Sequence, residues 1–168
     1  VAPVNSDHDL RRVAFAYDPF GRRVLKAARL DDGEETRTRF VWHGDALANE
    51  VVRSRGAEVL ARTYFFSDQP FVPLGHVDER PGAEAPSWRF YLNDTVGAPD
   101  KVVDGTGEVV QDLERRVWGR VPAAPDATPL RLPGQYEDAE TGLHYNRFRY
   151  YDPDDVRFIS PDPIGLQG

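Results

Sequence analysis

The chain has 168 residues, a formal net charge of −7, 14 glycines and 14 prolines, and it contains neither cysteine nor methionine. The absence of cysteine excludes disulfides, thiolate metal sites and thiol nucleophiles. The acidic balance argues against nucleic acid as the main partner, because phosphate binding needs a positive surface. No apolar run of about 18 residues predicts a membrane span. Without a methionine, Val1 is not a translation start, so we expect a processed chain or a piece of a longer protein.

Short strands separated by turns are predicted in chain order. In residues 12–17, Val13, Phe15 and Tyr17 alternate with smaller or polar neighbours, the period of a half-buried strand. Residues 18–21 (Asp-Pro-Phe-Gly) then provide turn chemistry. Further strands are predicted at residues 24–25, 36–42, 50–53, 63–66, 88–92, 101–103 and 108–110, with turns at 31–33 and 43–45 and long loops at 81–86 and 122–129.

Turn signals recur about every ten residues, which predicts an all-β, antiparallel, hairpin-rich fold without a long helix. Residues 15–24 resemble residues 149–158, and hairpins of this kind stack in series because one alone cannot bury its face. A β-solenoid or rolled sheet is therefore favoured, with a closed sandwich or barrel as the alternative. The arginine pairs at 11–12, 22–23 and 115–116 are interpreted as solvated strand faces, because carboxylates surround them.

The last 38 residues carry a more specific pattern. Residues 130–153 read LRLPGQYEDAETGLHYNRFRYYDP, and residues 157–166 read RFISPDPIGL. This stretch closely resembles the Rhs-repeat-associated core signature, which also occurs in the C components of insecticidal toxin complexes. Residues 17–24 and 104–110 look like divergent YD repeats. In one departure, residues 154–156 (Asp-Asp-Val) stand where the family has a Glu/Asp-Thr-Gly turn, and the lost glycine is expected to disturb that turn.

The resemblance implies three segments: YD-repeat hairpins at 1–121, a linker or loop at 122–129, and the Rhs core segment at 130–168. In this family the YD repeats form one sheet that spirals into a hollow cocoon, and the core segment closes it around a C-terminal toxin. The implied partners are the rest of the shell, the enclosed toxin and a secretion machine, either type VI or a toxin complex. No cofactor, metal, nucleic-acid partner or membrane span is implied. The parent is expected in the bacterial cytoplasm before it is secreted or injected.

The resemblance also implies a single-turnover, aspartyl-type self-cleavage after the leucine of the final Asp-Pro-x-Gly-Leu motif, here between Leu166 and Gln167. Two neighbouring carboxyl groups cannot both ionise readily, so one serves as general acid while the other activates water. Asp162 is one candidate, and its partner is expected to be Asp138, or failing that Glu140. Asp138 and Asp162 are 24 residues apart, so only the fold could bring them together.

Arg131 is the candidate electrostatic helper, because a guanidinium favours the charged form of a neighbouring carboxylate. The alternative is a simple ion pair with Glu137 or Asp138. His144 is interpreted as a hydrogen-bonded strand histidine rather than a base, and the four scattered histidines predict no metal site.

Two rival functions remain. The segment could be purely structural, with no protease activity. It could also be a carbohydrate- or surface-binding β-domain that uses Trp42, Trp88 and Trp118, although each tryptophan fits a strand pattern.

Overall fold

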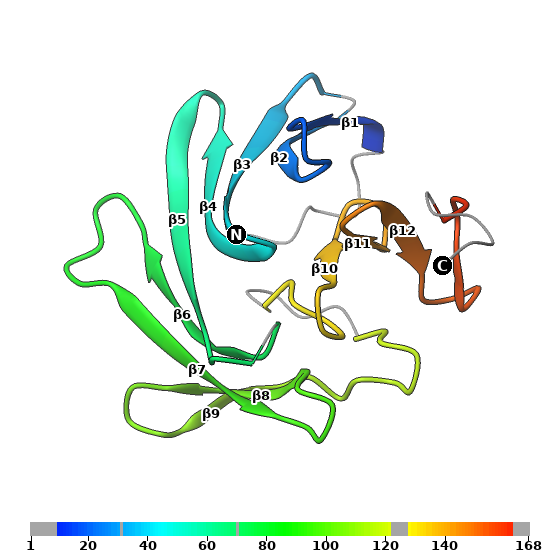
Figure 1. The fold of residues 1–168 in the computed structure, drawn as a ribbon. Coiled ribbons are helices and arrows are strands. Elements are labelled where there is room, and N and C mark those ends of the chain that lie inside the picture. Colours follow the sequence, from blue (N-terminus) through cyan, green and yellow to red (C-terminus); the bar gives the residue numbers. More distant parts are fainter. Residues whose placement is uncertain (1–9, 31, 70, 122–127, 163–168) are drawn as a thin grey trace.

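The computed structural model describes residues 10–30, 32–69, 71–121 and 128–162. The described chain consists of two antiparallel sheets joined by turns and loops, and it holds no helix (Figure 1). No helix long and apolar enough to cross a bilayer is therefore found in this part of the protein. The predicted all-β, hairpin-rich fold is confirmed.

The first sheet has nine strands in sequence order, so each strand pairs with the next along the chain. The strands curve around a concave side, and the two edge strands of the described sheet do not close on each other (Figure 1). The sheet is thus open and rolled rather than a closed barrel. Its strands are β1 (Leu10–Tyr17), β2 (Arg23–Leu30), β3 (Glu35–His43), β4 (Ala46–Ser54), β5 (Ala57–Phe66), β6 (Pro73–Glu79), β7 (Ser87–Asn93), β8 (Pro99–Asp104) and β9 (Val109–Asp112).

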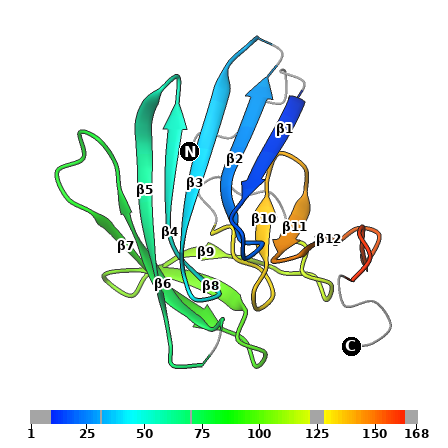
Figure 2. The same cartoon turned by 45° about the horizontal axis from the view of Figure 1, so that its top comes forward.

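The second sheet has four short strands and lies on the concave side of the first, which Figure 1 and Figure 2 show from two directions. Its strands are β10 (Tyr136–Asp138), β11 (Leu143–Asn146), β12 (Arg149–Asp152) and β13 (Arg157–Phe158). Tyr17 and Tyr150 join the sheets through a hydroxyl–hydroxyl hydrogen bond of 2.7 Å. Both sheets contribute to one core. The segment boundaries at 121 and 130 stay a prediction.

Strand alternation gives the first sheet an inner and an outer face. On β3, Thr38 and Phe40 are buried, whereas Arg37, Arg39 and Val41 are exposed. The inner face packs against the second sheet, and the outer face is open to solvent. One apolar cluster contains buried residues of both sheets and of the segments between β9 and β10: Phe40, Leu47, Tyr64, Tyr91, Val102, Leu113, Val121, Leu130, Tyr136 and Tyr145. The two sheets therefore stabilise each other through a shared core.

The tyrosine-rich core also contains paired polar groups. The hydroxyls of Tyr64 and Tyr136 donate to the two carboxylate oxygens of Glu50, at 2.8 and 2.6 Å. Arg62 binds Asp78 through two hydrogen bonds of 2.6 and 2.8 Å. A buried polar group is tolerated only where it is hydrogen-bonded, and these pairs meet that condition.

Strand β6 was not predicted, because its sequence begins with proline and is interrupted by Gly75. The structure explains the glycine: a Cβ at this position would lie 2.3 Å from the carbonyl oxygen of Arg89 on β7. The glycine that disfavours a strand in the sequence is thus required by the sheet, since only glycine permits this close backbone approach.

Replacing Gly75 with alanine is expected to lower the free energy of unfolding by about 1–3 kcal/mol, because the backbone of β6 or β7 must move. Chemical denaturation followed by tryptophan fluorescence measures this. Gly105 is the matched control, since a Cβ there meets nothing within 4 Å. If both glycine-to-alanine variants unfold at the same denaturant concentration, the steric explanation is wrong.

The departure at residues 154–156 has a visible consequence. Val156 adopts a φ of 54°, the left-handed region that glycine tolerates and a β-branched residue disfavours. The turn is held by Asp152, whose carboxylate accepts hydrogen bonds from the backbone amides of Asp154 and Asp155 at 2.9 and 3.2 Å. The turn therefore keeps the geometry that glycine would favour, while carrying a valine.

The variant Val156→Gly is expected to raise the free energy of unfolding by about 1 kcal/mol, because relief of backbone strain outweighs the extra entropy of glycine in the unfolded chain. Val156 is 40% exposed, so little packing is lost. Calorimetric melting temperatures test this, with Val156→Ala as the control that keeps a Cβ in the left-handed region. A lower melting temperature for the glycine variant would contradict the strain.

Candidate functional site

Asp138, the predicted partner of Asp162, lies at the end of β10 between the two sheets. Its side chain is completely buried. One carboxylate oxygen, Oδ2, lies 2.5 Å from Nη1 of Arg23, and the other, Oδ1, lies 3.2 Å from Nζ of Lys26. Both cations belong to β2 of the first sheet. The candidate carboxylate thus receives its counter-charges from a strand more than a hundred residues earlier in the chain.

Arg23 is itself completely buried, which contradicts its interpretation as part of a solvated strand face. Its guanidinium carbon lies 4.4–5.3 Å from the ring centroids of Phe15, Phe40, Tyr136 and Tyr145. Burial alone lowers the pKa of Arg23, but the Asp138 carboxylate outweighs it and raises that pKa above its ordinary value. The sequence gives no sign of this site, because the four rings come from two strands of one sheet, β1 and β3, and two of the other, β10 and β11.

Lys26 links the two alternative partners of Asp162. Its ammonium group lies 2.8 Å from Oε2 of Glu140 as well as 3.2 Å from Oδ1 of Asp138. Burial lowers the pKa of Lys26, but the carboxylates of Glu140 and Asp138 raise it to a value above the ordinary one. Arg23, Lys26, Asp138 and Glu140 therefore form one buried ion cluster, called the Asp138 cluster below.

Arg131 is placed elsewhere. It forms an ion pair with Glu137, and its Nη1 donates to the carbonyl oxygens of Thr128 and Leu130 at 2.6 and 2.8 Å. Burial lowers the pKa of Arg131, although Glu137 partly offsets this. Of the two ion pairs considered for Arg131, with Glu137 or with Asp138, the described contacts include the one with Glu137. The cations beside Asp138 are Arg23 and Lys26. The catalytic help expected from Arg131 stays a prediction.

Asp162 lies after β13, with 37% of its side chain exposed. It forms an ion pair of 3.1 Å with Arg149 of β12, whose guanidinium lies over the Phe158 ring at 3.6 Å. Leu166 and Gln167 lie outside the described residues. The structure therefore brings Asp138 and Glu140 together through Lys26, and the approach of Asp162 to Asp138 stays a prediction.

His144 is buried in β11, and its Nδ1 lies 2.9 Å from Oε1 of Gln135. Because that oxygen only accepts, Nδ1 carries the proton. Burial lowers the pKa of His144 to about 4, so the ring is neutral near pH 7. The interpretation as a hydrogen-bonded strand histidine is confirmed.

The three tryptophans do not share an environment. Trp42 of β3 is partly buried, and its indole nitrogen donates to the carbonyl oxygen of Arg23 at 2.7 Å. Trp88 of β7 is exposed on the outer face and stacks on Phe65, with ring centroids 5.6 Å apart. Trp118 lies in a turn rather than in the predicted strand. Within the described ranges, no group of three or more histidine, aspartate or glutamate side chains is arranged to hold a metal ion.

Comparison with known proteins places this architecture. No family model matches the sequence. The chain is 41% identical over 179 residues to the double-stranded DNA deaminase toxin A of Burkholderia cenocepacia, covering 92% of this chain and 12% of that protein. It is 32% identical over 163 residues to the probable deoxyribonuclease RhsB of Dickeya dadantii, covering 94% of this chain and 11% of that protein.

Among solved structures, the TcdB2-TccC3-TEV crystal structure matches with a TM-score of 0.71 at 21% identity, covering 94% of this chain and 8% of that one. This likeness supports the fold. The chain spans about an eighth of the curated relatives' length, and it aligns with them over both of its sheets. The chain thus belongs to the Rhs family of toxin proteins, and it contains the Rhs-repeat-associated core region.

Proposed function

We propose that this chain is the C-terminal part of an Rhs shell that encloses a toxin, and that the parent protein cleaves itself between Leu166 and Gln167. Asp138 and Asp162 act as the acid–base pair, with Glu140 as the alternative partner. The proteins with which the chain interacts are the remaining shell, the toxin and a secretion machine. The proposal rests on the Rhs core motif together with the buried position of Asp138.

The Asp138 cluster is the observation that supports this function most strongly. Four ionisable side chains from both sheets are brought together out of water, with Asp138 and Arg23 fully buried. Buried ion pairs seldom stabilise a fold more than apolar residues of the same volume would. Clusters of buried, perturbed ionisable groups are enriched at functional sites. A functional role for Asp138 therefore accounts for a cluster that folding stability alone does not require.

The proposed reaction is hydrolysis of one peptide bond. Asp138, flanked by two cations, serves as the carboxylate that removes a proton from water, whose oxygen attacks the carbonyl carbon of Leu166. Asp162 leaves its ion pair with Arg149, takes up a proton from solvent and serves as the acid, delivering that proton to the nitrogen of Gln167 as the carbon–nitrogen bond breaks. The products are a Leu166 carboxylate and a new amino terminus at Gln167. One turnover consumes the site, because its own chain is the substrate.

Variants of the parent protein, with its sequence continuing beyond Gly168, test the assignment. Asp162→Asn and Asp138→Asn are each expected to leave the full-length band intact on a gel, because each removes one titrating carboxyl group. Arg131→Ala is expected to slow cleavage and shift its pH dependence. His144→Gln is the control and is expected to retain cleavage, since the ring is neutral and hydrogen-bonded rather than catalytic.

Circular dichroism establishes that each variant is folded, so that loss of cleavage is not mistaken for loss of structure. A folded Asp162→Asn variant that is processed normally removes the acid from the proposal. Normal processing in Asp138→Asn alone transfers the base to Glu140, and Glu140→Gln then has to abolish cleavage.

A further inference from the structure

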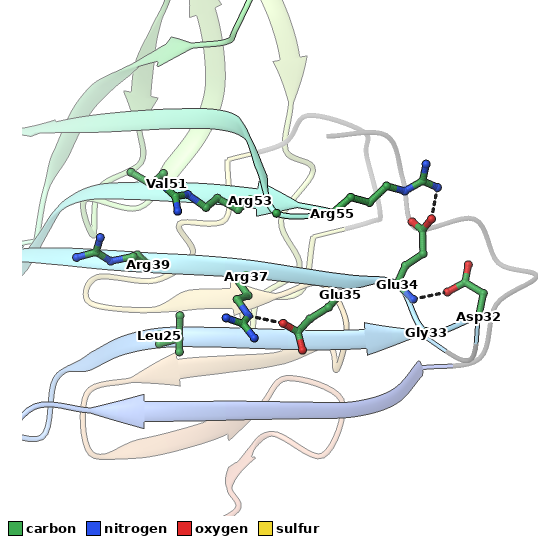
Figure 3. Close-up of a pocket in the computed structure, with 11 residues that line it drawn as sticks. Leu25, Asp32, Gly33, Glu34, Glu35, Arg37, Arg39, Val51, Arg53 and Arg55 are labelled. Carbon is green, nitrogen blue, oxygen red and sulfur yellow. Dashed lines mark hydrogen bonds and ion pairs between the residues drawn. The ribbon is translucent and has the colours of Figure 1, made fainter.

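The outer face of the first sheet carries a groove that is separate from the Asp138 cluster. It has a volume of ≈ 690 Å³ and lies over β2, β3 and β4, at the end where their hairpin turns meet (Figure 3). Its lining is rich in arginine, although the chain as a whole is acidic. The lining residues are Leu25, Asp32, Gly33, Glu34, Glu35, Arg37, Arg39, Val51, Arg53, Arg55 and Gly56.

Two of these arginines lack a counter-charge. Arg39 and Arg53 are exposed and form no ion pair with any residue that the structure describes. Arg53 lies directly opposite Arg37 in the β3–β4 register. On its other side, Arg53 faces Glu58 of β5. Like charges directly opposite on paired strands destabilise a sheet. Arg37 is paired with Glu35, whereas Arg53 forms no ion pair with the Glu58 that it faces, so the guanidinium groups of Arg39 and Arg53 remain open to an external anion.

The acidic side chains of the groove lie at its other end, and they are already engaged. Glu34 pairs with Arg55, and Glu35 pairs with Arg37 (Figure 3). Asp32 accepts a hydrogen bond of 2.8 Å from the backbone amide of Glu34. The positive end at Arg39 and Arg53 is therefore left for an external ligand.

The floor beside the unpaired arginines is apolar. Leu25 of β2 and Val51 of β4 flank Arg39 in register, one on each side. Alternate residues of β3 on this face, Arg37 and Arg39, repeat at about 6.8 Å, twice the rise of a strand. The alternate side chains of any extended peptide repeat at the same distance, so such a peptide lying along β3 would match this spacing.

We propose that this groove binds an extended acidic peptide with a carboxylate at every second position. The carboxylates meet Arg39 and Arg53 directly, and they meet Arg37 in exchange for Glu35. Their methylene groups pack on the floor. Arginine suits this role because its planar guanidinium pairs with carboxylates in two-point geometry. Inorganic phosphate would fill a small part of the groove, and a long polyanion would meet Glu34 and Glu35 and a chain of net charge −7.

Fluorescence anisotropy with labelled peptides on the 168-residue chain tests this. The first peptide is Glu-Ser repeated four times, and the second has the same composition arranged as four glutamates followed by four serines. The first is expected to bind at least fivefold more tightly, because only its spacing matches the strand. Inorganic phosphate and a single-stranded oligonucleotide are competitors expected to displace the peptide weakly.

The variant carrying Arg39→Gln and Arg53→Gln is expected to bind the alternating peptide at least tenfold more weakly. The matched control carries Arg12→Gln and Arg29→Gln, which also removes two exposed arginines of the same sheet, here a pair that face each other on β1 and β2 outside the groove. This control is expected to change affinity less than twofold. Equal binding of the two peptides, equal loss in both variants, or tighter binding of the oligonucleotide overturns the proposal. Self-cleavage of the parent is a separate readout, so failure here leaves the Asp138 proposal untouched.

Discussion

Replacing Asp138 with alanine is expected to lower the free energy of unfolding by about 3–5 kcal/mol, the usual range when one partner of a buried ion pair is removed. Arg23 would remain fully buried, with an uncompensated charge among aromatic rings. Lys26 would retain Glu140 alone. The change therefore destabilises the contact between the two sheets, and the unfolding transition should remain cooperative because both sheets share the core.

Urea denaturation followed by tryptophan fluorescence measures this loss. The matched control is Asp154→Ala, which removes an exposed ion pair with Arg120 and should cost less than about 1 kcal/mol. The double variant Arg23→Met with Asp138→Leu should recover most of the stability, because apolar residues replace both charges. A loss below about 1 kcal/mol in the single variant would show that the cluster is not a buried, coupled unit.

Mild acid is expected to destabilise the fold through two buried histidines. Burial lowers the pKa of His76 to about 3 and that of His144 to about 4. Because the unfolded chain protonates these rings near pH 6.5, it binds more protons than the folded chain between pH 6.5 and the folded values. The stability that the two neutral rings contribute is thus fully present above pH 6.5. Below that pH the free energy of unfolding falls by about 1.4 kcal/mol per pH unit for each ring.

At pH 5 the expected loss is about 4 kcal/mol relative to pH 7, since each ring contributes 1.5 units of about 1.4 kcal/mol. Asp78 acts at lower pH: despite its burial, Arg62 lowers its pKa below 3.8. The test is denaturation at pH 7, 6 and 5. His144→Gln should remove about half of the pH slope, with the same substitution at exposed His43 as the control for loss of an imidazole. A flat profile from pH 7 to 5 would contradict the buried neutral rings.

Much of the fold could be predicted from the sequence because hairpins are local. The alternation in residues 12–17 and the turn at 18–21 predicted β1 and its turn, and Gly21 donates to the carbonyl oxygen of Asp18 at 3.0 Å as such a turn requires. Strand β6 was missed because Gly75 looks like a strand breaker until its close approach to β7 is known. Trp118 was assigned to a strand because short apolar patterns do not distinguish strands from turns.

The site was predictable only in part. The core motif singled out Asp138 and Glu140, which the structure places around one lysine. The cations could not be predicted, because Arg23 lies 115 residues before Asp138 and its sequence context is that of a solvated strand. Such pairing depends on how the second sheet docks on the first, and no local pattern encodes it.

Self-cleavage is tested by the intact mass of the parent protein, purified after folding with its sequence continuing beyond Gly168. Two fragments are expected, one ending at Leu166 and one beginning at Gln167. The same chain kept denatured from synthesis onward should stay whole, because the reaction requires the folded arrangement of Asp138 and Asp162. A folded parent that retains its full-length mass, or that is cut at a different bond, would contradict self-cleavage at this site.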